Sequence, residues 1–147
     1  MLVTAEPHTA GLSLRTRLPF GWVLLFYKRG IPLTFNCNIA EDSLVWAGQQ
    51  NPGKWIEHSR YVALACKNIA AQCENMDADR AYCFGLLHDI GRYAGVSSER
   101  HLIDGYRFCM ERGWEKAAQI CISHAFMIQD IHTSIGTFDV TEEDFAL

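Results

Sequence analysis

The chain lacks several patterns that would place it in a common functional class. None of its six cysteines belongs to a C-x-x-C pair, which excludes a zinc ribbon and a thioredoxin-type motif. The longest strongly apolar run, residues 22–27, is too short to span a bilayer. Basic residues are not in excess either, because 13 Lys and Arg stand against 17 Asp and Glu. The formal net charge of −4 argues against a general nucleic-acid binder.

The chain also shows no sign of an exported protein. Arginines precede the apolar run at 22–27, but no small-residue cleavage site follows it, so we predict no signal peptide. Five of the six cysteines lie in helical patterns among small and aliphatic residues, where buried free thiols are common. We therefore predict reduced core cysteines and a cytoplasmic protein. The six are Cys37, Cys66, Cys73, Cys83, Cys109 and Cys121.

A chain of 147 residues is long enough for one domain with a real core. Residues 1–36 differ from the rest, because they hold three of the four prolines and show no helical period. Two short strands, 22–27 and 31–35, are one interpretation. An irregular arm is the interpretation we favour. We divide the chain into an irregular arm, 1–40, and a helical domain, 41–147.

Apolar residues at three- and four-residue spacing predict helices through the rest of the chain. Expected helices are a short one near 44–47, then 54–74, 78–90, about 98–112 and 114–126, with another beginning at 141. Asp77 and Ser97 or Ser98 are expected caps, and Gly113 an expected end. The fold class is therefore all-α, a compact helical bundle. In the helix 54–74 we expect one buried face, formed by His58, Val62, Ala65, Cys66, Ile69 and Cys73.

The most informative stretch is 81–92, an apolar run that ends in the adjacent pair His88-Asp89. Burying the run carries this ionisable pair to the rim of the core, where it needs a partner. A metal cation satisfies a neutral imidazole and a carboxylate together. The sequence therefore points to a metal site beside His88 and Asp89.

Three further histidines fall on or beside the expected inward faces of other helices: His58, His101 and His124. Any one of them, taken alone, is better explained as a core histidine bonded to a backbone carbonyl. Four buried imidazoles each need a partner, and a shared metal supplies several at once. His8 and His132 fall outside these patterns and are expected at the surface.

These residues resemble the HD-domain superfamily of metal-dependent phosphohydrolases. The pattern is His58, then His88-Asp89 thirty residues later, within helical sequence. The local sequence 88–92 is similar to the HDIG variant of the signature, and His101 and His124 resemble the extra histidines of two-metal subfamilies. The resemblance covers roughly residues 41–147.

The resemblance implies a role for each matched residue. His58, His88 and Asp89 would hold a first divalent metal, and Asp89 would bridge to a second one held by His101 and His124. The ion would be Fe, Mn, Zn, Co or Mg, and one or two would bind. Arg92 is the candidate for contacting a substrate phosphate, Arg60 and Lys54 are weaker candidates for that role, and Asp104 is a candidate for orienting His101. Among the phosphate candidates Arg92 stands first, and a solvated loop arginine is its alternative.

One family feature has no clear counterpart. The family closes its first metal site with an aspartate on a later helix, and the only downstream aspartates here are Asp130, Asp139 and Asp144. None lies in the expected apolar helical pattern. We therefore expect a member shortened at its C-terminus, with an incomplete first site.

Three functions follow from these patterns. The first is a phosphohydrolase that cleaves a phosphate ester or anhydride of a small molecule, with nucleotides among the candidates, by metal-activated water. Asp89 and Arg92 are its expected catalytic residues. The second is a non-catalytic HD-like module that binds a nucleotide or a protein partner. The third makes the histidines core residues only. We expect a small phosphorylated ligand rather than a membrane or duplex nucleic acid.

Overall fold

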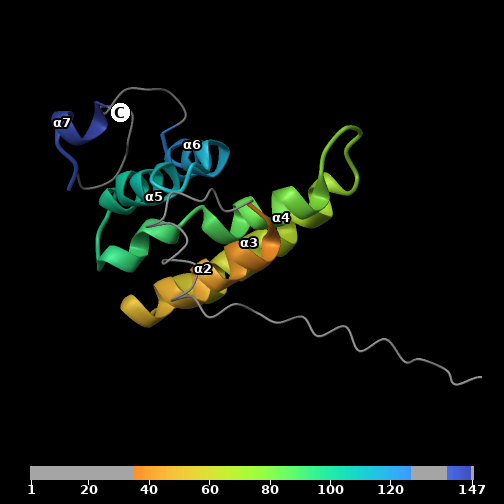
Figure 1. Ribbon diagram of the computed structural model, residues 1–147, viewed down its shortest axis with the longest axis horizontal. Helices are drawn as coiled ribbons and strands as arrows, with labels where there is room; N and C mark the ends of the chain where they lie inside the picture. Colours follow the sequence, from red (N-terminus) through yellow and green to blue (C-terminus); the bar gives the residue numbers. More distant parts are fainter. Residues whose placement is uncertain (1–34, 127–138, 147) are drawn as a thin grey trace, which may run out of the picture.

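The computed structural model describes residues 35–126 and 139–146 (Figure 1). The regular elements in these ranges are all helices, which confirms the all-α prediction. They are α2 (Cys37–Gln50), α3 (Trp55–Ala70), α4 (Ala78–Leu87), the 3-10 helix η1 (Ile90–Ala94), α5 (Arg100–Met110), α6 (Glu115–Ser123) and α7 (Glu142–Phe145). None of the described helices has the length and apolar character needed to cross a membrane. The strands considered at 22–27 and 31–35 lie outside the described residues, except for Phe35.

The helices form two groups that meet on α4 and η1 (Figure 1). One group is α2 with α3, and both pack against α4. The other is α5 with α6, which contact η1 and α4 respectively. The segment that follows α4 is therefore placed at the junction of the two groups, with helices of both around it.

The core is built from the apolar lead-in of the His-Asp pair and the helices around it. Leu86 and Leu87 are fully buried, as is Ile90 just beyond the pair. Burying each such side chain contributes about 1.5–3 kcal/mol to folding. Burial of this run confirms that hydrophobic packing brings residues 88 and 89 to the edge of the core.

Helix α4 begins as predicted and ends earlier than predicted. The carboxylate of Asp77 accepts hydrogen bonds from the backbone N–H groups of Asp79 and Arg80, which is the expected N-cap. The helix ends at Leu87, and the chain continues as η1 instead of running helically to residue 90. Gly91 does not end α4 but lies inside η1, pressed against α5. A Cβ added there would stand 1.9 Å from the carbonyl oxygen of His101.

The predicted buried face of α3 was wrong. Its buried residues are Ser59, Ala63 and Ala70, while Ile69 is 65% exposed and His58 is exposed. Of the other predicted members, Val62 and Cys66 are half-buried, and Ala65 and Cys73 are exposed. The reason is close helix packing: a Cβ on Gly85 of α4 would lie 2.5 Å from the Cα of Ala63. Backbones this close leave room only for small side chains on α3. The face with Ser59 and Ala63 therefore packs against α4, and the predicted face with Ile69 does not.

Helix α2 begins earlier than its acidic residues suggested. It begins at Cys37, with Asn36 as N-cap, because the Asn36 side chain accepts a hydrogen bond from the N–H of Ile39. The early start brings Cys37 to α4, where it forms a disulfide with Cys83. The prediction that these two cysteines are reduced core residues was therefore wrong. The other four are free, and Cys109 and Cys121 are buried as predicted.

Breaking the Cys37–Cys83 bond is expected to lower the free energy of unfolding by about 3–4 kcal/mol, because it closes a long loop in the unfolded chain. The two residues are 46 positions apart. Urea unfolding of the oxidised protein, with and without a thiol reductant, measures the effect. Cys37→Ser should reproduce the reduced value and respond no further to reductant, whereas Cys73→Ser should behave as the parent. Equal stability of the parent in both conditions would contradict the expectation.

The last described segment is tied to the start of α5. The expected caps Ser97 and Ser98 do not cap this helix, whose N-cap is Glu99, without a side-chain hydrogen bond. The carboxylate of Asp139 instead accepts the N–H groups of Ser98 and Arg100, both at 2.7 Å. Helix α7 begins as predicted, with a capping box formed by Thr141 and Asp144.

Candidate metal centre

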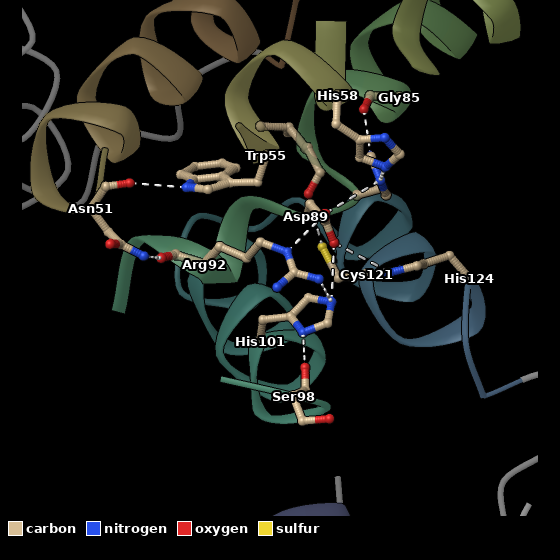
Figure 2. A network of polar contacts seen from close by, with 12 residues as sticks. Asn51, Trp55, His58, Gly85, Asp89, Arg92, Ser98, His101, Cys121 and His124 are labelled. Carbon is tan, nitrogen blue, oxygen red and sulfur yellow. Dashed lines mark hydrogen bonds and ion pairs between the residues drawn. The ribbon is translucent and has the colours of Figure 1, made fainter. Parts of the chain in front are cut away.

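Five ionisable side chains meet where the two groups of helices join (Figure 2). His58 comes from α3, His88 is the C-cap residue of α4, and Asp89 is the N-cap residue of η1. His101 lies in the first turn of α5, and His124 caps the end of α6. The structure therefore brings together all five residues predicted as metal ligands.

The five residues form two triads that share Asp89. In the first triad the Nε2 atoms of His58 and His88 are 3.3 Å apart, and His88 Nε2 is 3.8 Å from Asp89 Oδ2. The second triad uses the other carboxylate oxygen. His101 Nε2 is 3.0 Å and His124 Nε2 is 3.5 Å from Asp89 Oδ1. Asp89 Oδ1 thus faces two imidazoles, and Oδ2 faces the imidazole of His88.

Backbone carbonyls fix the protonation of three of these imidazoles. His88 Nδ1 lies 2.7 Å from the carbonyl oxygen of Gly85, and His124 Nδ1 lies 3.3 Å from that of Ile120. His101 Nδ1 lies against the carbonyl oxygen of Ser98. A carbonyl oxygen only accepts, so each Nδ1 carries the proton. In the neutral form of these rings Nε2 offers a lone pair toward Asp89, and in the protonated form it donates to the carboxylate.

Burial and charge make Asp89 a strong acceptor. Its exposure is 4%, and those of His88 and His101 are 7% and 5%. Burial favours the neutral carboxyl, but the surrounding histidines and the Arg92 guanidinium favour the anion and prevail. The pKa of Asp89 therefore lies well below its ordinary value. Burial also lowers the pKa of His88, against the opposing charge of Asp89, so this ring is neutral near pH 7.

Close contacts at two glycines create the cluster. The approach of Gly85 to Ala63 brings α3 to α4, and with it His58 to His88. The approach of Gly91 to α5 brings Asp89 to His101, because a Cβ at Gly91 would also lie 2.3 Å from the backbone N of Gly105. The glycine of the HDIG-like sequence therefore has a geometric role in bringing the second triad together.

Arg92 lies inside the cluster and is not a solvated loop residue. Its Nε donates to Asp89 Oδ2 at 2.9 Å, and a terminal guanidinium nitrogen lies 3.3 Å from His101 Nε2. Its backbone is held from α2, because Asn51 Nδ2 donates to the carbonyl oxygen of Arg92 at 2.7 Å. Trp55 Nε1 in turn donates to the carbonyl oxygen of Asn51 at 2.9 Å (Figure 2).

The weaker candidates have other partners or stand apart. Arg60 pairs with Glu41 at 2.7 Å, and Lys54 is an exposed residue at the start of α3. Asp104 contacts Arg100 at 3.5 Å, while the Ser98 carbonyl orients His101.

The downstream aspartates have other contacts as well. Asp139 binds the start of α5, and Asp144 pairs with Arg100 at 3.0 Å and Arg107 at 3.1 Å. Asp130, His8 and His132 lie outside the described residues.

Sequence reasoning did not identify Asn51, Trp55 and Ser98 as supports of the site. Each acts through a backbone group: Trp55 and Asn51 bind carbonyl oxygens, and Ser98 uses its own carbonyl. Backbone contacts of this kind are independent of residue type at the acceptor. The Asn-Pro-Gly break at 51–53 was the only available signal, and it indicated a turn.

The donor set fits divalent metal. In the absence of a cation or an added proton, the Nε2 lone pairs would face a carboxylate at 3.0–3.8 Å, an arrangement of acceptors against acceptors. Imidazole nitrogens together with a carboxylate suit divalent ions such as zinc, iron, manganese and cobalt. The backbone carbonyls that bind each Nδ1 are the usual outer partners of metal-binding histidines.

Comparison with known proteins identifies the type of domain to which part of the chain is similar. Residues 46–113 match the family model of the HDOD domain, an HD-like domain. The matched segment includes four of the five cluster residues, and His124 lies beyond it. No curated protein and no solved structure matches the chain.

Proposed function

We propose that this protein is a metal-dependent phosphohydrolase that cleaves a phosphate ester or anhydride of a small molecule, with nucleotides among the candidate substrates. The observation that carries the proposal is the convergence of imidazole lone pairs on one shared carboxylate. The match to an HD-like domain supports the same reading. The substrate class rests on the local positive charge of Arg92 and on the resemblance to HD-type enzymes.

In this proposal the two triads divide the work of binding. His58, His88 and Asp89 would hold one ion, and Asp89, His101 and His124 would hold the other. A bound divalent ion supplies a hydroxide at neutral pH and polarises a phosphoryl oxygen. Exposed edges at His58 and His124 leave the cluster open to a substrate on that side. The Nδ1 contacts with backbone carbonyls keep the Nε2 atoms of three rings aimed inward: His88, His101 and His124.

Arg92 would bind the phosphate group in this proposal. Its guanidinium presents a planar fork of donors that matches phosphate oxygens. Its side chain is 29% exposed, so part of it reaches the surface of the cluster. The Asn51 hydrogen bond fixes the backbone from which this side chain extends.

A non-catalytic module that binds a nucleotide or a protein is the second candidate. It is favoured by the shortage of carboxylates, because Asp89 is the only acidic residue among the metal-competent clusters of the described ranges. Such a module would hold a nucleotide tightly without turnover. Incubation with a panel of phosphate esters, nucleotides and anhydrides separates the two candidates. Release of phosphate in step with bound metal supports the hydrolase, and tight binding without release supports the module.

Metal removal is expected to lower the melting temperature by about 5–10 °C. An ion present at about 100 times its dissociation constant stabilises the fold by about 2.7 kcal/mol, and each kcal/mol is worth a few degrees in a domain of this size. Thermal unfolding before and after EDTA, together with elemental analysis of the purified protein, measures this. Adding Mn²⁺ back should restore the original value. A melting temperature that changes with neither EDTA nor Mn²⁺ would mean that the histidines are core residues only.

A further inference from the structure

Arg92 contacts two atoms that would bind metal in the proposed site. Its Nε binds Asp89 Oδ2, the oxygen that faces His88 in the first triad. Its terminal nitrogen lies against His101 Nε2, a ligand atom of the second triad. One guanidinium therefore touches a ligand atom of each half of the cluster.

The contact with His101 is exclusive. Because Nδ1 of this ring donates to the Ser98 carbonyl, the neutral ring has a single lone pair to offer, on Nε2. A guanidinium only donates hydrogen bonds, so its contact at 3.3 Å uses that same lone pair. His101 can accept from Arg92 or bind a metal ion, but it cannot do both.

The contact with Asp89 works in the same direction. A carboxylate oxygen can have several partners, but a divalent ion at Oδ2 would stand next to a guanidinium 2.9 Å from that oxygen. Like charges at such separations repel strongly in a buried site. The guanidinium charge stabilises the same anion that a metal would stabilise, so the two compete for Asp89.

Displacement by metal would not carry Arg92 far away. Its backbone carbonyl is held by Asn51 and by the N–H of Gly95, and its N–H binds the carbonyl of Asp89. A guanidinium released from His101 and Asp89 stays beside the cluster without its anionic partner. A phosphate anion is then its natural new partner.

We propose that Arg92 is an internal cation that competes with divalent metal for His101 and Asp89, so that metal binding and phosphate binding strengthen each other. The proposal rests on the metal site proposed above but not on hydrolytic activity. Linkage requires the effect to be mutual: phosphate that attracts Arg92 frees the ligands, and metal that takes the ligands frees Arg92.

Titration of the full-length protein with Mn²⁺, in the presence and absence of inorganic phosphate, tests this. Arg92→Met keeps the aliphatic stem and removes the charge and the donors. Without phosphate it should bind Mn²⁺ at least about tenfold more tightly than the parent. The matched control is Arg107→Met, which removes an arginine paired with Asp144 at 3.1 Å, outside the cluster. It should bind as the parent does.

Phosphate should then raise the Mn²⁺ affinity of the parent and of Arg107→Met by about fivefold or more, within the usual range of coupling between sites. In Arg92→Met the gain should be less than about twofold. An equal gain in Arg92→Met would mean that phosphate acts through the metal alone, and would overturn the coupling. If Arg92→Met bound Mn²⁺ no more tightly than the parent in the absence of phosphate, Arg92 would not compete with the metal. The proposed metal site would be unaffected by that result. A lack of Mn²⁺ binding by all three proteins would overturn the metal site itself.

Discussion

Asp89→Asn is expected to lose divalent metal and phosphate hydrolysis together. The substitution keeps the size of the side chain but removes the charge that both triads share. Replacing even an outer partner of a metal ligand costs about 10–100-fold in affinity, so loss of the bridging ligand should exceed about 100-fold. Elemental analysis after dialysis and a phosphatase assay on the same preparation measure the two effects.

Asp79→Asn is the matched control for this substitution. Asp79 lies in the first turn of α4, and its exposed carboxylate pairs with Lys67 at 2.8 Å, outside the cluster. It should retain full metal content and activity. If Asp89→Asn kept its metal while losing activity, Asp89 would act on substrate and not as the shared ligand. Retention of both would remove the basis of the proposed function.

Gly91→Ala is expected to destabilise the protein by about 3 kcal/mol or more. The new methyl group would lie 1.9 Å from the backbone oxygen of His101 and 2.3 Å from the backbone nitrogen of Gly105. Overpacking costs about 1–3 kcal/mol where side chains can yield, and here only backbone meets the methyl group. Separation of η1 from α5 should also weaken Mn²⁺ binding, because Asp89 and His101 would move apart.

Gly48→Ala serves as the control for an added methyl group. Its Cβ would meet Ile56 Cδ1 at 2.7 Å, which is the far end of a flexible side chain. Alanine also favours a helix interior over glycine by about 0.5–1 kcal/mol. Urea unfolding should therefore show a small change in this variant and a large one in Gly91→Ala. Two similar stabilities would show that η1 and α5 can separate at little cost.

The elements that sequence predicted well are those with local causes. The Asp77 cap and the Thr141–Asp144 capping box depend on neighbouring residues, and both were confirmed. Burial of Leu86 and Leu87 follows from an uninterrupted apolar run. The convergence of four histidines and Asp89 was predicted from the need of inward-facing imidazoles for partners and from a family resemblance. The resemblance carries information on tertiary structure that spacing alone does not.

The errors have tertiary causes. Hydrophobicity favoured Ile69 for the inward face of α3, but the approach of Gly85 selected the small residues Ala63 and Ser59. The early start of α2 depends on Asn36, which lies next to a segment without helical pattern. That early start, in turn, is what brings Cys37 to Cys83. Sequence periodicity contains none of these distances between helices.

The hydrogen bonds of Asp139 connect the cluster to a segment much later in the chain. The same peptide segment that presents its carbonyl to His101 gives its N–H groups at Ser98 and Arg100 to this carboxylate. A binding partner or protease that peeled residues 139–146 from α5 would loosen that segment without touching a single ligand. The Ser98 carbonyl would then hold His101 less firmly, and in the proposed metal site the second triad would bind its ion more weakly.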